Sequence, residues 1–88
     1  MSNLELNDFY SSAYLITIGF ELMDIYKVGS QSTFVFEGSD EAREELSKFY
    51  TMEATVNAAK YAQEVKKLKT IIHQHSNLKS ATNSYGKE

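Results

Sequence analysis

Residues 56–75 read VNAAKYAQEVKKLKTIIHQH, and they predict the long helix against which the rest of the chain packs. Apolar residues recur there at alternating spacings of four and three, which places them on one stripe of an α-helix. The run contains no glycine or proline that would break it. The stripe comprises Ala54, Ala58, Tyr61, Val65, Leu68, Ile72 and His75. We expect it to face the core.

The opposite arc of this helix is basic and forms a candidate nucleic-acid surface. Its residues are Lys60, Lys66, Lys67, Lys69 and His73. Lysines in a row along a helix can track phosphate groups. The arc has no arginine, which is the residue that reads guanine edges, and the net charge of −3 repels nucleic acid at a distance. The alternative is a solvated face whose lysines pair loosely with the acidic segment before them.

The length of 88 residues predicts one domain, and a hydrophobic fraction of 42% is ample for a folded core. The absence of cysteine excludes disulfides and suits a cytoplasmic protein. The start, MSNLELND, lacks the basic and apolar regions of a signal peptide, and no apolar run is long enough to span a membrane. We expect a domain over residues 1–76 and a disordered polar tail over residues 77–88.

The first expected element is a helix that Asn7 or Asp8 caps and Gly19 ends. Its core-facing positions are Leu6, Phe9, Ala13, Ile16 and Phe20. Its far arc is also apolar and carries Tyr14, Leu15 and Ile18, which makes these three the candidate partner-binding residues. Two other readings remain open. The arc can be buried inside the monomer, or the β-branched residues 16–18 can begin a strand early.

Residues 20–28 (FELMDIYKV) and 33–37 (TFVFE) predict two strands joined by a turn at residues 29–32. The short connection favours an antiparallel hairpin. Asp24 interrupts the alternation of the first strand, which indicates a bulge or an exposed edge. Two strands alone are marginal in water, so the hairpin needs helices on one face or a neighbour's strand along an edge.

Ser39 is a suitable N-cap for a short helix that ends near Thr51. Its buried stripe comprises Ala42, Leu46 and Phe49. Thr55 can then cap the long helix, which runs to about His75. The order helix, hairpin, helix, long helix predicts an α+β fold with a two-stranded antiparallel sheet.

The sequence predicts no catalytic residue, metal site, cofactor or small-molecule substrate. His73 and His75 point about 200° apart on a helix, so they cannot bind one metal ion together. The acids of residues 40–45 read as an ordinary solvated helix surface, and no phosphate-binding loop or nucleophile motif is present. We therefore expect a protein that binds rather than an enzyme.

Several aromatic and aliphatic groups resemble a family of short uncharacterised single-domain proteins from bacteria, phages and mobile elements. These groups are Tyr14-Leu15, residues 19–22 (GFEL), residues 33–37 (TFVFE), residues 48–50 (KFY) and the helix with Tyr61, Leu68-Lys69 and Ile72. The resemblance covers about residues 9–75. Such families often carry a glycine between the last two helices, where this chain has Thr51-Met52. The resemblance implies a compact α+β accessory protein and assigns no activity or functional residues.

These patterns together predict a small binding protein that acts through protein–protein association. The partner is a second copy or a larger host or replication protein, and inhibition of a host enzyme is one form of such docking. Nucleic-acid binding through the lysine face is the alternative.

Overall fold

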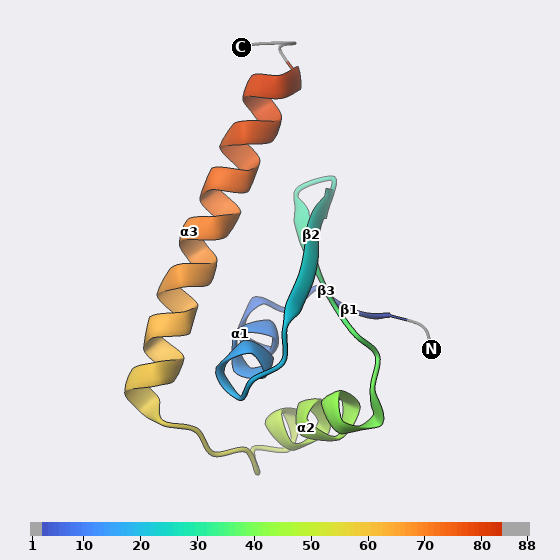
Figure 1. Cartoon of the computed structure of the whole chain (residues 1–88), viewed down its shortest axis with the longest axis vertical. Helices are drawn as coiled ribbons and strands as arrows, with labels where there is room; N and C mark the ends of the chain where they lie inside the picture. Colours follow the sequence, from blue (N-terminus) through green and yellow to red (C-terminus); the bar gives the residue numbers. More distant parts are fainter. Residues whose placement is uncertain (1–2, 84–88) are drawn as a thin grey trace.

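A computed structural model describes residues 3–83 of the chain, with side chains placed for residues 3–74 (Figure 1). The elements in order are β1 (Leu4–Leu6), α1 (Phe9–Thr17), β2 (Leu22–Val28), β3 (Gln31–Phe36), α2 (Asp40–Tyr50) and α3 (Ala58–Asn83). The predicted mixture of helices and strands is confirmed. The number of strands is not, because the sheet has three strands in the order β1-β3-β2.

Strand β1 is the element that the sequence did not predict. It pairs antiparallel with β3, with Leu4 opposite Phe36 and Leu6 opposite Phe34. Both leucines are buried in the core. Three residues are too few to show a period of two, so the pairing becomes visible only when β3 lies beside them. The third strand supplies the support that an isolated hairpin lacks.

The β2–β3 hairpin is confirmed, with a tighter turn than expected. Val28 pairs with Gln31, so the turn consists of Gly29 and Ser30 alone. Gly29 has a φ of +65°, the sign that a type II′ turn requires at its first central residue. The register shifts between Leu22 and Asp24, which confirms the predicted bulge on this edge strand.

Helix α1 begins and ends where the sequence indicates. The carboxylate of Asp8 accepts a hydrogen bond of 2.8 Å from the backbone N–H of Ser11. At the other end Gly19 has a φ of +112°, and the N–H of Phe20 donates to the carbonyl of Leu15 at 2.9 Å. Together with a 3.1 Å bond from the N–H of Gly19 to the carbonyl of Ile16, this bond closes the helix in a Schellman-type turn. Residues 16 and 17 are therefore helical, and no strand starts there.

The core forms around α1, with α3 along one side, the sheet along the other and α2 below (Figure 1). Its fully buried side chains come from four elements, including Ala42 of α2. They include Leu15 of α1, Phe34 and Phe36 of β3, and Leu68 of α3. A helix with apolar residues on two sides is stable here because other elements cover both of those sides, while Tyr10 stays 52% exposed.

Helix α2 starts as predicted, since the hydroxyl of Ser39 accepts a hydrogen bond of 3.1 Å from the N–H of Ala42. The predicted cap of α3 is wrong. The helix begins at Ala58, and the side chain of Asn57, not Thr55, accepts a 2.9 Å bond from the N–H of Lys60. Asparagine is at least as good a cap as threonine, and it stands at the correct distance from the free N–H.

At its other end α3 continues to Asn83, beyond the expected end near His75. The side chain of His75 and residues 84–88 lie outside the described residues, so the expected disorder over residues 77–88 stays a prediction. Among residues 3–83, no helix combines the length and the apolar character that a membrane crossing requires.

Candidate functional site

Two of the three residues expected to bind a partner are buried inside the chain. Tyr14 is 3% exposed and Leu15 is 0% exposed, while Ile18 is half-buried at the end of α1. The hydroxyl of Tyr14 donates a 2.9 Å hydrogen bond to the Glu45 carboxylate. Its ring packs on Phe49 with centroids 5.2 Å apart. The expectation of an outward-facing position is therefore wrong for Tyr14 and Leu15, and α2 covers Tyr14.

The contact between Tyr14 and α2 also changes the chemistry of the phenol. Burial raises the pKa of Tyr14 above its usual range, and the hydrogen bond to Glu45 raises it further. A neutral tyrosine beside a carboxylate is a structural hydrogen-bond donor at physiological pH.

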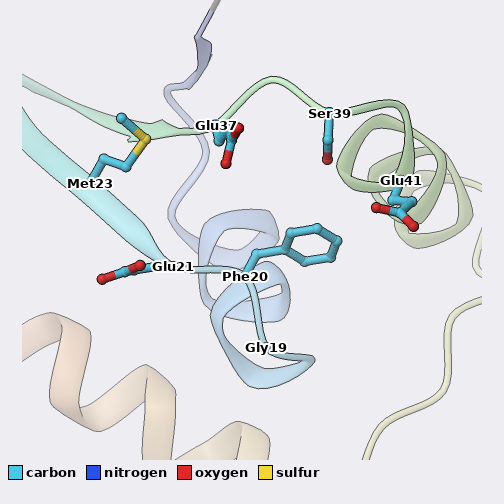
Figure 2. A pocket seen from close by; sticks show the side chains of 7 residues that line it. All are labelled: Gly19, Phe20, Glu21, Met23, Glu37, Ser39 and Glu41. Carbon is cyan, nitrogen blue, oxygen red and sulfur yellow. The ribbon is translucent and has the colours of Figure 1, made fainter.

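Next to this contact lies a hollow with a volume of about 480 Å³. It forms where the end of α1, the start of β2, the end of β3 and the start of α2 meet (Figure 2). Figure 2 shows the ring of Phe20 pointing across the space toward α2, with Glu37 and Ser39 on the far side. The lining residues are Gly19, Phe20, Glu21, Met23, Glu37, Ser39 and Glu41.

A second hollow of about 480 Å³ adjoins the first, and the two share Phe20 and Glu41. The second is lined by Tyr14, Ile18, Phe20, Glu41, Glu45 and Thr55. We call the two together the acidic groove, because its polar rim consists mainly of Glu21, Glu37, Glu41 and Glu45. Apolar surface from Phe20, Met23 and Ile18 lies between these acids.

The acidic groove suits a partner that is basic and partly apolar. No lysine, arginine or histidine lines either of its hollows, and of the four glutamates only Glu45 forms an ion pair among the described side chains, with Lys48 at 3.4 Å. Within the described part of the chain, no group of three or more potential ligand residues is placed to hold a metal ion. Opposite charge on a partner would make the encounter faster and more selective.

The second candidate surface is the outward side of α3. The predicted basic residues Lys60, Lys66, Lys67, Lys69 and His73 are all exposed. Lys67 forms an ion pair of 3.6 Å with Glu64 on the same helix. Ile71 is 44% exposed, although the neighbouring Leu68 is 1% exposed. Lys66, Lys67, Thr70 and Ile71 border a shallow hollow of about 370 Å³, and we call these four residues the outer patch.

Sequence reasoning found the lysines of the outer patch and missed its isoleucine. Ile71 and Ile72 are adjacent, and the three-four pattern assigns only Ile72 to the buried stripe. Ile71 follows Leu68 by three residues and therefore lies about 60° from it around the helix, at the margin of the buried stripe. That signal was present in the sequence, because the spacing places Ile71 between the buried stripe and the arc that carries the lysines.

The similarity to known proteins covers both surfaces. A family model described as Domain of unknown function (DUF5659) matches residues 1–74. The chain belongs to this family. The matched part of this DUF5659 chain runs from β1 into α3 and contains the acidic groove and the outer patch. No curated protein and no solved structure gives a significant match. The family description assigns no activity, so function has to be argued from these two surfaces.

Proposed function

We propose that this DUF5659 protein is a small non-enzymatic binding protein that acts through protein–protein association, with itself or with a larger protein. The observation that supports this most directly is the exposed Ile71 in the outer patch of α3. An isoleucine that is half-exposed in a lysine-rich setting gains about 25 cal/mol per Å² when a partner covers it.

The position of α3 makes the outer patch accessible. The helix packs against α1 through a side that includes the buried Leu68. Figure 1 shows α3 rising along one flank of the molecule and past the turn between β2 and β3. Its outward side therefore has no neighbour within the described part of the chain over the length of the outer patch.

We include in this proposal an accessory role in a phage or mobile element, with docking on a larger host or replication protein. The resemblance of the core residues to such proteins supports it, and the identity of neighbouring genes tests it. A cytoplasmic setting is supported by the absence of cysteine from the sequence.

Nucleic-acid binding through Lys60, Lys66, Lys67, Lys69 and His73 is the second candidate function. The exposure of all five side chains supports it. The four carboxylates of the acidic groove and the ion pair between Lys67 and Glu64 weigh against it, because they reduce the positive field that attracts phosphate.

Light scattering at micromolar concentration tests the proposal. We expect twice the chain mass of 10.0 kDa for the unmodified protein, and about one chain mass for Ile71→Asp, which puts a charge in the contact. Val28→Asp is the matched control, because it changes another exposed apolar residue outside both surfaces and should leave the mass doubled. Leu15→Asp is unsuitable here, since a buried acid would unfold the chain.

The same samples separate the two candidate functions. With duplex DNA at low salt, we expect no mobility shift. A shift that disappears in Lys66→Glu with Lys69→Glu would favour the nucleic-acid alternative. A monomer for the unmodified protein at micromolar concentration would rule out self-association.

A further inference from the structure

The acidic groove and the outer patch carry opposite charges and do not pair with each other within one chain. The acidic groove carries four glutamates, and the outer patch carries Lys66 and Lys67. Among the described side chains the ion pairs are Glu45 with Lys48 and Glu64 with Lys67, each within one helix. Neither joins the groove to the patch. Within the described part of one chain, therefore, no glutamate of the acidic groove forms an ion pair with a lysine of the outer patch.

Geometry explains why one chain cannot bring the two surfaces together. In Figure 1, α2 lies at the base of the molecule, whereas α3 rises away from that base along another flank. On α3, Lys66, Lys67 and Thr70 lie on the exposed arc, and Ile71, which is 44% exposed, lies at the margin of that arc beside the buried Leu68. A contact between groove and patch requires two molecules.

We propose that the acidic groove of one copy receives the outer patch of a second copy. Ile71 then packs on the apolar surface of Phe20 and Met23. Lys66 and Lys67 lie against the glutamates of the rim. When each copy places its outer patch in the acidic groove of the other, the two contacts are related by a two-fold axis. The assembly is then a closed dimer. This inference rests on the proposed function and names its partner.

Charge decides against the other ways of pairing two copies. Placing one outer patch on another would oppose lysine to lysine, and placing one groove on another would oppose glutamate to glutamate. Like charges in close contact repel each other, whereas opposite charges guide the encounter and define the register. Groove against patch is the combination of these two surfaces that brings opposite signs together.

Charge reversal on each surface tests the pairing. The groove variant carries Glu21→Lys, Glu37→Lys and Glu41→Lys, all at exposed side chains. The patch variant carries Lys66→Glu and Lys67→Glu. Each variant alone opposes like charges, so light scattering should give the mass of one chain. An equimolar mixture makes both contacts opposite in sign again and should restore the mass of two chains.

Two controls keep the test specific. A variant with Lys27→Glu and Arg43→Glu reverses as many charges as the patch variant at residues that line neither surface, and it should remain a dimer. Far-ultraviolet circular dichroism establishes that each variant is folded. The dimer of the unmodified chain should weaken as salt rises, because its charged contacts are screened.

The outcomes distinguish this inference from the proposed function. If the unmodified chain is a dimer and both variants remain dimers, the groove and the patch are not the interface, and association itself stands. If both variants are folded monomers but their mixture is also monomeric, the two surfaces do not pair. A monomer for the unmodified chain at micromolar concentration overturns the self-pairing altogether.

Discussion

At the scale of single residues, Met52 has the most unusual backbone. Within residues 3–83 it is the one residue other than glycine with a positive φ, at +65°, and its side chain is 92% exposed. Its N–H donates to the carbonyl of Phe49 at 3.2 Å, and the N–H of Glu53 donates to the carbonyl of Lys48 at 2.8 Å. These two bonds make the Schellman turn that ends α2, in which the left-handed position is usually glycine. The resemblance to short single-domain proteins also leads us to expect a glycine in this connection.

We predict that Met52→Gly raises the free energy of unfolding by about 0.5–1 kcal/mol. The left-handed conformation costs a residue with a side chain about 1–2 kcal/mol, and the greater freedom of glycine in the unfolded state offsets part of the gain. Urea unfolding measures the change. Met52→Ala is the matched control, because it removes the side chain and keeps the strain. Equal stability of the two variants would contradict this explanation.

At the scale of elements, the capping residues determine where each helix starts. Asp8, Ser39 and Asn57 each accept a hydrogen bond from a backbone N–H three residues later. Such a bond satisfies one of the donors that a helix leaves free in its first turn. The start of α3 at Ala58 therefore follows from Asn57. Thr55 lies outside the helix, on the rim of the acidic groove.

We predict that Asn57→Ala lowers the free energy of unfolding by about 1 kcal/mol, since it removes the cap of α3. Thr55→Ala should change it by less than about 0.5 kcal/mol, as expected of an exposed residue that is not a cap. Thermal and urea unfolding of the two variants provide the comparison. A larger decrease in the free energy of unfolding for Thr55→Ala than for Asn57→Ala would show that Thr55 caps α3, as the sequence predicted.

At the scale of the whole molecule, tyrosine hydroxyls connect elements that are far apart in the chain. Tyr14 of α1 donates to Glu45 of α2 at 2.9 Å, and Tyr26 of β2 donates to Glu5 of β1 at 2.7 Å. Tyr61 of α3 donates to the backbone carbonyl of Tyr10 at 3.2 Å. Burial raises the pKa of Tyr14 and Tyr61, and the hydrogen bond to Glu5 raises the pKa of Tyr26. In the folded chain all three therefore keep their protons to a higher pH.

We predict that the fold loses stability as the pH rises above about 10. Below the ordinary tyrosine pKa of about 10, the folded and unfolded chains are both protonated at these sites, and the hydrogen bonds contribute fully. Above it the unfolded chain releases protons first, so stability falls as the pH rises through the raised pKa values of the folded state. Urea midpoints measured from pH 7 to 11 should show this decline. It should be smaller in Tyr14→Phe than in Tyr10→Phe, and equal slopes would contradict the assignment.

The sequence by itself determined the features that depend on residues a few positions apart. The caps Asp8 and Ser39, the end of α1 at Gly19, the bulge before Asp24 and the buried Leu68 of α3 are of this kind. Turn, cap and periodicity rules are local, because backbone hydrogen bonds within a helix or a hairpin join near neighbours. The basic face of α3 was predictable for the same reason.

Only the tertiary structure decided the features that bring distant segments together. Residues 4–6 become a strand because β3 lies beside them, and Tyr14 and Leu15 are buried because other elements cover both sides of α1. The acidic groove combines glutamates from the start of β2, the end of β3 and the first turns of α2. The burial of a side chain, and the meeting of glutamates from different elements in one groove, depend on how the elements pack against one another. Residue spacing along the chain does not specify that packing.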